Sequence, residues 1–387
     1  MPEISQNYIM STSISIKEVS GKKELKEFIY LPEKVHKGHK GWVHPIYMDE
    51  WNYFNPKKNH SFAHCDTILL LAYRDQKVVG RIMGIINHKY NEAKSESNGR
   101  WNFLEIYNDQ EVAHSLLRYV EDWAREKGML KMIGPFAFSE KDPQGYLIEG
   151  FERLMVIASH GNYPYMIDIL ENAGYTKEID LVAYKVDIPD EDPPIYNRIS
   201  ERTIRNNPKL RLLEYTSRRK LRPMVKPVLE LLNKTFKDIY GFDAMTEREM
   251  HEFASRYLIF INPRFVKVIV DSNDVPVAFV IGMGEIGVGV QRCKGRVLPF
   301  GIFKILKESK RSKQITLLLG GIDSKYRGRG LDTLMGLKMI ASGREAGKTY
   351  FDSHCELETN HQVRAEMEKM GGVVIKRYRI FQKDIRT

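Results

Sequence analysis

The stretch of this 387-residue sequence with the clearest capacity for chemistry is KYRGRGLD, which contains Arg327, Gly328, Arg329 and Gly330. It lies between an apolar run, ITLLLGGI, and a helix-like run that begins at Leu331. If these runs form a strand and a helix, the first backbone N–H groups of that helix lack partners. The glycines let a ligand approach those groups, and the helix dipole adds positive potential. The pattern therefore predicts an anion site, most naturally for phosphate or pyrophosphate.

Two common phosphate motifs do not fit this loop. A P-loop ends in Gly-Lys-Ser/Thr, and no such ending follows Gly330. A dinucleotide-binding fingerprint requires a third glycine three residues later, where Thr333 stands. An Arg-x-x-Gly-x-Gly/Ala turn remains, and the simpler alternative is a tight strand-to-helix turn with surface arginines.

The elements around this loop occur twice along the chain. Residues 66 to 87 and residues 264 to 283 each predict a β-hairpin, with turns at 74 to 77 and 271 to 274. A strand and an amphipathic helix follow each hairpin, and Gly128 and Gly347 are plausible caps at the ends of those helices. Each copy closes with a helix end, a glycine and a further strand, so the chain reads as two copies of one α/β unit.

The proline-rich acidic segment VDIPDEDPPIY, residues 186 to 196, predicts a domain boundary near residue 190. The expected division is a first domain at 11 to 190, a linker and helix at 191 to 208, and a second domain at 209 to 387. The expected fold class is α/β (α+β), with mixed, mostly antiparallel sheets flanked by helices. The segment from 217 to 241 is helical by pattern, with Leu229, Leu232 and Phe236 on one face.

The segment GIDSKYRGRGLDTLM resembles the acyl-coenzyme A (acyl-CoA) pyrophosphate loop of the GCN5-related N-acetyltransferases (GNATs). LETNHQVRAEMEKMGG supplies an Asn and a Gly at the spacing of that family. The resemblance covers residues 209 to 387 well and residues 11 to 190 more loosely, which implies two tandem GNAT-like domains. The whole chain also resembles uncharacterised bacterial tandem acetyltransferase-like proteins, in which segments like RVLPFG, IKRYRIF and GYLIEGF recur.

The resemblance implies a set of coenzyme-binding residues. The loop N–H groups would hold the pyrophosphate, the edge of the preceding strand would pair with the pantetheine arm, and an Asn would contact that arm. Carried onto this sequence, these residues are Gly321, Ile322, Asp323, Tyr326, Arg327, Gly328, Arg329, Gly330, Leu331 and Asn360.

This sequence departs from the family pattern at two positions. Met367 stands where many members have the tyrosine that protonates the leaving thiolate, and a methionine has no proton to give. Gly372 stands where the motif has an aromatic residue. A thiolate is already a good leaving group, because the pKa of a free thiol is roughly 8 to 9. The missing acid therefore does not exclude catalysis.

The first half lacks the glycine loop. Asn108, Asp109 and Glu111 stand where the glycines would be, and carboxylates there complement the helix dipole and would repel a pyrophosphate. The first domain is therefore expected to be degenerate, without a pyrophosphate loop. The long glycine- and proline-containing stretch from 134 to 151 is either a ligand-covering loop or a loop with structural packing only.

Transfer of an acyl group to an amine requires a neutral amine, so a carboxylate or histidine usually accepts its proton. The candidates are Glu285 in VIGMGE and Asp352, His354, Glu356 and Glu358 in YFDSHCELETN. Strand alternation would place the latter four on one face. Glu285 and His354 are the preferred catalytic residues, and the alternative is that each is an ordinary polar strand residue.

Charge and composition restrict the partners. The formal net charge is +10, but the basic residues are spread, with a local excess only at 304 to 313, which reads as a solvated helix end or loop. Nucleic acid is therefore an improbable partner, and salt-dependent binding would be its signature. No segment is apolar enough to span a bilayer, the N-terminus lacks the apolar stretch of a signal peptide, and no membrane partner is expected.

No metal site is expected. The histidines at 36, 39, 44, 60 and 64 match no helical ligand pair, apart from His60 and His64, which could fall one turn apart. Cys65, Cys293 and Cys355 are too scattered for a disulfide framework, which favours a reduced, cytoplasmic protein. The resemblance to the GNATs implies an acetyl-CoA- or acyl-CoA-dependent N-acetyltransferase with an unidentified small-molecule or peptide amine as acceptor. The alternative is a non-catalytic acyl-CoA sensor or scaffold, and the oligomeric state is open.

Overall fold

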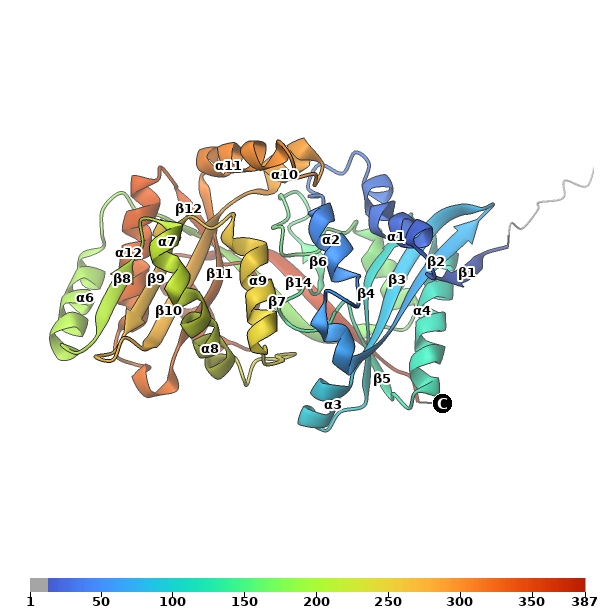
Figure 1. The fold of residues 1–387 in the computed structure, drawn as a ribbon, viewed down its shortest axis with the longest axis horizontal. Coiled ribbons are helices and arrows are strands. Elements are labelled where there is room, and N and C mark those ends of the chain that lie inside the picture. The colour runs from blue at the N-terminus through green and yellow to red at the C-terminus, as the bar shows by residue number, and fades with distance from the viewer. Residues whose placement is uncertain (1–12, 387) are drawn as a thin grey trace, which may run out of the picture.

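The computed structural model describes residues 13–386. The expected start of the first domain at residue 11, most of the N-terminal stretch without a signal peptide, and residue 387 lie outside the described residues. The described chain forms one long molecule in which strands run through the middle and helices lie on both sides (Figure 1).

Both predicted hairpins are present. In the first half, β2 (Cys65–Arg74) and β3 (Lys77–Asn87) are joined by two residues with positive φ, Asp75 at 50° and Gln76 at 61°. Two such residues form the kind of tight turn that matches the twist of paired strands. In the second half, β9 (Val266–Val270) and β10 (Pro276–Gly284) turn through Asp274, whose φ is 61°.

Each hairpin is followed by the predicted strand and helix. The first half has β4 (Asn98–Ile106) and α4 (Gln110–Glu126), and the second half has β11 (Gln314–Ile322) and α12 (Leu331–Glu345). Gly128 and Gly347 follow these helices with φ of 79° and 67°, so both predicted glycine caps are confirmed.

The predicted mixed α/β class is confirmed by a single 14-stranded, mostly antiparallel sheet in residues 13–386. Twelve of its strands follow the order β1-β2-β3-β4-β5-β14-β7-β12-β11-β10-β9-β8, while β6 pairs with β14 and β13 pairs with β7. The strands not yet placed are β1 (Ser15–Glu18), β5 (Lys131–Gly134), β6 (Tyr146–Glu149), β7 (Thr176–Asp187), β8 (Arg211–Glu214), β12 (Tyr350–Asp352), β13 (Glu356–Leu357) and β14 (Val373–Asp384).

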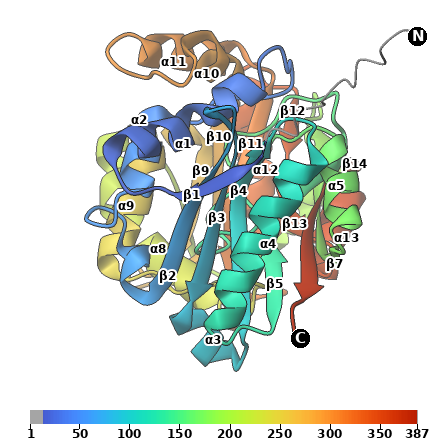
Figure 2. The same cartoon turned by 90° about the vertical axis from the view of Figure 1, so that its right-hand side faces the viewer.

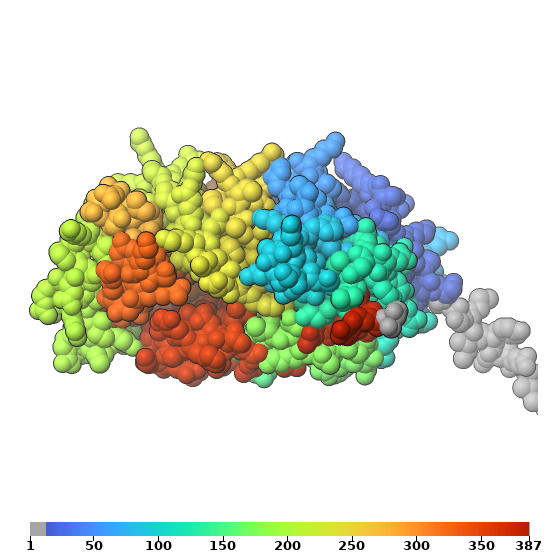
Figure 3. All heavy atoms as spheres, turned by 90° about the horizontal axis from the view of Figure 1, so that it is seen from below, coloured from blue at the N-terminus to red at the C-terminus, as the bar shows by residue number. Residues whose placement is uncertain are grey.

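The two halves exchange their closing strands. Strand β14, which ends the second half, pairs with β5 of the first half, while β7, which ends the first half, pairs with β12 of the second. The two exchanged strands also pair with each other. The C-terminal end of the chain therefore lies beside α4 of the first half (Figure 3), where the Arg125 guanidinium donates to the Ile385 carbonyl oxygen at 2.9 Å. The domain boundary near residue 190 stays a prediction.

Helices cover both faces of the first half of the sheet. Leu70, Ile82 and Leu104 pack beneath α4, whereas the adjacent residues Leu71, Met83 and Phe103 pack on the other face with Phe28 of α1. This alternation is the two-residue period of a strand. Figure 2 shows α4 on one face and α1 on the other.

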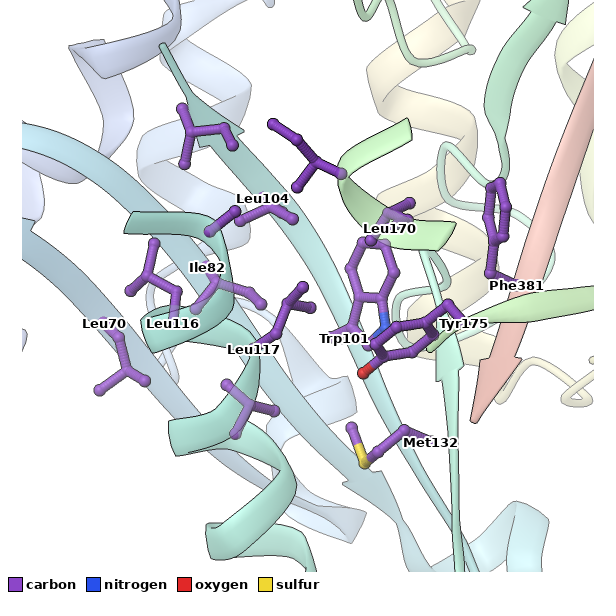
Figure 4. Packing of buried hydrophobic residues seen from close by; sticks show 14 of the residues in the cluster. Leu70, Ile82, Trp101, Leu104, Leu116, Leu117, Met132, Leu170, Tyr175 and Phe381 are labelled. Atoms are coloured by element: carbon purple, nitrogen blue, oxygen red, sulfur yellow. The ribbon is translucent and has the colours of Figure 1, made fainter. Parts of the chain in front are cut away.

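The core of the first half includes the exchanged strand. Phe381 of β14 is fully buried with Trp101, Tyr175 and Leu170 (Figure 4). The first half therefore completes its core with a side chain from the last residues of the chain.

The remaining helices join or flank these elements. They are α1 (Lys22–Val35), α2 (Tyr47–Tyr53), α3 (His88–Lys94), α5 (Tyr165–Asn172), α6 (Pro194–Asn206), α7 (Arg218–Leu221), α8 (Val225–Thr235), α9 (Glu247–Leu258), α10 (Gly287–Cys293), α11 (Gly301–Arg311) and α13 (His361–Lys369), with short 3-10 turns at His60–His64, Arg222–Met224, Pro263–Phe265 and Ser324–Tyr326.

Candidate functional site

The second half contains an open strand edge. Strands β11 and β12 run parallel and pair only from Gln314 to Thr316, after which they diverge. From Leu317 to Ile322 the other edge of β11 stays paired with β10. A segment of extended ligand can therefore hydrogen-bond to the free edge of β11 as an added strand.

A cavity of about 950 Å³ lies beside this free edge. Its walls come from α8, α9, β11, α12 and α13 of the second half and from β7 of the first half. Apolar side chains predominate, among them Leu181, Val186, Leu221, Val228, Leu229, Leu232, Phe236, Phe253, Leu258, Leu317, Leu319, Met335, Met339, Met367 and Met370. The three side chains that the sequence placed on one face of a helix, Leu229, Leu232 and Phe236, thus line the cavity.

The predicted loop leads from β11 into the N-terminus of α12. Gly328 and Gly330 have φ of 71° and 78°, a backbone conformation that favours glycine. No side chain caps the helix at Gly330, so the first-turn N–H groups of α12 remain available to a ligand. A Cβ at Gly328 would meet nothing within 4 Å, whereas a Cβ at Gly330 would meet Thr203 of α6.

The two arginines of the loop have different surroundings. Arg327 lines the cavity, and its Nε lies 3.4 Å from the Ile322 carbonyl oxygen. Arg329 stacks on the Tyr326 ring at 4.9 Å and donates to the Lys325 carbonyl oxygen at 3.0 Å. Arg327 is therefore placed to meet an anion, while Arg329 and Tyr326 fix the shape of the loop.

At the end of β11, the backbone N–H of Ile322 is free for a ligand, whereas the backbone groups of Asp323 are already hydrogen-bonded within the protein. The Asp323 N–H donates to the Val277 carbonyl oxygen at 2.9 Å, and the Asp323 carbonyl oxygen accepts from Tyr326 at 2.8 Å. The main-chain groups of Asp323, which were expected to pair with the pantetheine arm, are therefore already used within the protein. Because successive N–H groups of a strand point to opposite edges, the N–H of Ile322 points to the free edge.

Asn360 and Met367 both line the cavity from the region of α13. The Asn360 side-chain oxygen accepts from the Val363 N–H at 3.4 Å and caps the helix, while its amide N–H₂ group keeps its donors for a ligand. Met367 lies where the resemblance expects a tyrosine and presents only a thioether.

Of the titratable candidates, His354 and Glu356 line the cavity. Burial, together with the nearby Glu366 carboxylate, raises the pKa of Glu356 to about 7. Burial lowers the pKa of His354 to about 4, so this imidazole is neutral at neutral pH. A group with a pKa near the working pH is the most effective general base, which favours Glu356 over His354.

The other candidates are engaged elsewhere. Glu285 lies outside the cavity lining and accepts a hydrogen bond from the Gly287 N–H. Asp352 forms a buried ion pair with Lys376 at 3.2 Å, and Glu358 pairs with Lys177 at 2.7 Å. The predicted alternation of these residues is wrong, because β12 ends at Asp352 and His354 has φ of 60°.

The equivalent splay in the first half is filled by its own chain. Strands β4 and β5 pair only from Asn98 to Arg100. Beyond that point the Phe136 N–H donates to the Trp101 carbonyl oxygen at 2.9 Å, and the Tyr165 hydroxyl donates to the Ile106 carbonyl oxygen at 2.8 Å.

The start of α4 differs from the start of α12 as well. The Asp109 side chain caps α4 by accepting from the Val112 N–H at 3.1 Å, and Arg74 pairs with Asp109 at 3.0 Å. A carboxylate and its arginine thus occupy the position at which α12 offers free N–H groups.

The structure gives no support for a metal ion or a membrane span in the part of the chain that it describes. Within residues 13–386, no three His, Cys, Asp or Glu side chains are grouped as metal ligands would be. His60 and His64 instead pair with Glu252 at 3.2 Å and Asp243 at 3.3 Å. No helix in the same range has the length and apolar character needed to cross a bilayer.

Two bacterial proteins are similar to this chain along almost its entire length. A "Bacterial ceramide synthase" of Caulobacter vibrioides (strain NA1000 / CB15N) is 27% identical over 380 residues, which are 96% of this chain and 98% of the relative. "Protein YghO" of Escherichia coli (strain K12) is 26% identical over 376 residues, 94% of each chain. A comparison with models of known protein families finds no match.

The fold has a counterpart among solved structures. A tandem GNAT protein from the clavulanic acid biosynthesis pathway aligns with a TM-score of 0.55 at 10% sequence identity, over 97% of this chain and 99% of that chain. The agreement spans both halves, as the repeated order of elements predicts. This protein therefore has a GNAT-type tandem fold.

Proposed function

We propose that this protein is an acyl-CoA-dependent N-acyltransferase whose second half binds the coenzyme and transfers the acyl group to an amine. The observation that carries the proposal is the free edge of β11, which lies between an uncapped helix N-terminus and an apolar cavity that contains Glu356. The acyl-CoA would supply the activated thioester. Residues Arg327 to Leu331 would hold its pyrophosphate, and the free edge of β11 together with Asn360 would hold its pantetheine arm.

The side chains and N–H groups around the cavity would support acyl transfer. Glu356, directly or through water, would accept a proton from the acceptor's ammonium group, so that the neutral amine attacks the thioester carbonyl carbon. The Ile322 N–H would donate to the carbonyl oxygen as negative charge develops on it. The thiolate would leave without an acid, since Met367 cannot supply a proton.

The cavity and one relative support a specific choice of acyl group and acceptor. The cavity of about 950 Å³ is far larger than an acetyl group, and its walls are mostly apolar. A ceramide, the product named for the Caulobacter relative, is the amide of a long-chain acid and a long-chain amino alcohol. We therefore propose a long acyl chain and a lipid amine as substrates, in place of the acetyl group expected from the sequence.

A direct test measures amide formation. The full-length protein is incubated with palmitoyl-CoA or acetyl-CoA and with sphinganine, and thiol release and product mass are recorded. We expect amide product, with palmitoyl-CoA preferred. Binding of acyl-CoA without thiol release for any amine would instead support the alternative, a sensor that has lost catalysis along with the tyrosine replaced by Met367.

Two variants distinguish the candidate bases. Glu356→Gln should lower kcat by about 10²- to 10⁴-fold while acyl-CoA affinity is retained, because only proton transfer is lost. Glu285→Gln should retain activity, because this side chain lies outside the cavity. The reverse pattern, with activity lost in Glu285→Gln and kept in Glu356→Gln, would show that the sequence preference was right and the placement of the base proposed here is wrong.

A further inference from the structure

Helices α10 and α11 form a hairpin that stands out from the rest of the molecule (Figures 1 and 2). The segment between them, residues 294 to 300, contains all of the RVLPFG sequence except its glycine, Gly301, which begins α11. Three large apolar side chains on this hairpin are exposed to solvent: Leu298 at 65%, Phe300 at 72% and Phe303 at 67%. Exposed apolar side chains gathered in one place usually mark a contact surface.

The hairpin is held to the protein by its other face. Ile305 of α11 is fully buried in a cluster with Trp42 and Val43 of the first half and Val290 of α10. The Gln291 side chain donates to the Trp42 carbonyl oxygen at 2.7 Å. The outward apolar residues are therefore not needed to anchor the hairpin.

Basic side chains share the outward face with these apolar ones. Phe300, Phe303 and Leu306 recur every three residues, and Lys307 and Lys310 fall on the same side of the helix, opposite Ile305. Lys304 is exposed beside them. Arg292, Arg296 and Arg311 of the hairpin form ion pairs. Within residues 13–386, Lys304, Lys307 and Lys310 form none.

We propose that the α10–α11 hairpin docks on the surface of an anionic lipid bilayer. Phenylalanine and leucine beside unpaired lysines on one helix face are the composition of helices that lie in the bilayer interface. The apolar side chains would enter the boundary of the acyl chains, and the lysines would meet anionic headgroups. This surface revises the expectation of no membrane partner, because the exposure of Phe300 and Phe303 cannot be read from the sequence.

The hairpin is also close to the cavity. Leu318 lines the cavity and packs against the cluster that contains Ile305. In a protein docked through α10–α11, the hairpin and the apolar cluster beneath it would therefore lie between the bilayer and the cavity. Bilayer docking goes beyond the proposed acyl transfer. Because vesicle binding is measured without acyl-CoA, docking and acyl transfer can fail separately.

The test is cosedimentation of the full-length protein with vesicles of phosphatidylglycerol and phosphatidylcholine, or of phosphatidylcholine alone, at low and high salt. We expect binding to the anionic vesicles that weakens as salt rises. Phe300→Ser with Phe303→Ser, and separately Lys304→Gln with Lys307→Gln and Lys310→Gln, should each weaken binding on the order of 10- to 100-fold.

Matched controls replace exposed residues of the same kinds elsewhere. They are Ile195→Ser with Ile204→Ser on α6, and Lys22→Gln with Lys23→Gln and Lys26→Gln on α1, all exposed positions. Control variants that bind like the wild type support the proposal. It is overturned if the wild type does not bind anionic vesicles, or if hairpin and control variants weaken equally. A concentration-dependent dimer that the Phe variant abolishes, without vesicle binding, would assign the face to a second copy instead.

Discussion

At the scale of single residues, the local environment distinguishes side chains that look equivalent in the sequence. Glu285, His354 and Glu356 are all polar residues near strand ends. Burial lowers the pKa of His354 to about 4 but raises that of Glu356 to about 7, because desolvation disfavours whichever form is charged. Glu285 does not reach the cavity at all. The sequence indicated these residues as candidate general bases. Which of them is best suited depends on burial and on contacts with segments that are distant in the sequence.

The pKa of Glu356 has a measurable consequence for stability. Since the folded-state pKa of about 7 lies above the ordinary value of 4.5, folding favours the protonated form. The stability linked to this group is fully present below pH 4.5 and is lost as pH rises to about 7 and beyond. Relative to the wild type, Glu356→Gln should therefore gain on the order of 1–3 kcal/mol between pH 4 and pH 8.

Urea unfolding of both proteins at pH 4 and pH 8 measures this gain. Glu358→Gln is a suitable control, because Glu358 pairs with Lys177 and should lose stability on substitution instead of gaining it. An equal difference between Glu356→Gln and wild type at both pH values would show that Glu356 titrates normally.

At the scale of elements, the cavity arises because β11 and β12 pair over only three residues and then separate. Helix α12 borders the resulting space and contains Gly336, where an added Cβ would meet nothing within 4 Å. A glycine inside a helix costs about 1 kcal/mol relative to alanine. Gly336 is thus a position at which the cavity can be filled without disturbing the fold.

If the proposed acyl transfer is correct, Gly336→Leu should shorten the acyl chain that this protein accepts. Its kcat/KM for palmitoyl-CoA should fall at least about tenfold relative to that for acetyl-CoA, since one or two methylenes in an apolar pocket already change selectivity by about 10- to 200-fold. Gly336→Ala, which adds a single methyl group, serves as the control with little effect. An unchanged palmitoyl-to-acetyl ratio in Gly336→Leu would place the acyl chain outside this cavity.

Many of the hairpins and helix ends could be predicted from local sequence. The polar pair Asp75 and Gln76 between apolar runs indicated a hairpin, and Gly128 indicated the end of a helix; both are present. The cavity could not be predicted, because the apolar face of α8 that carries Leu229 and Leu232 has the same pattern whether it meets a packed core or an open space.

At the scale of the whole molecule, the exchange of β7 and β14 makes the halves mutually dependent. The sequence could not reveal it, because the two closing strands have similar patterns and either could pair in either half. In the structure, Phe381 is fully buried in the core of the first half. Removing the second half would therefore leave a void in that core and two unpaired edges, at β5 and β7.

A fragment of residues 1 to 190 should consequently fail to unfold cooperatively or should aggregate, whereas the full chain should show one cooperative transition. Circular dichroism during heating measures both. Coexpression of residues 191 to 387 is the control and should restore a soluble complex. A fragment with its own sharp transition would mean that the first half is stable without β14.

The proposed function depends on acyl-CoA binding by the loop from Arg327 to Leu331. Isothermal calorimetry with palmitoyl-CoA or acetyl-CoA tests it most directly, with Gly328→Asp as the variant. Gly328 is preferable to Gly330, because a side chain at 330 would collide with Thr203. Gly347→Asp is the matched control: it has a similar φ of 67°, open space around its Cβ and the same added charge, but it lies at the other end of α12.

We expect micromolar binding of acyl-CoA to the wild type and to Gly347→Asp. Binding to Gly328→Asp should be weaker by about tenfold or more, because a carboxylate would face the pyrophosphate. Equal affinity of Gly328→Asp and wild type would show that the loop at the start of α12 does not hold the pyrophosphate.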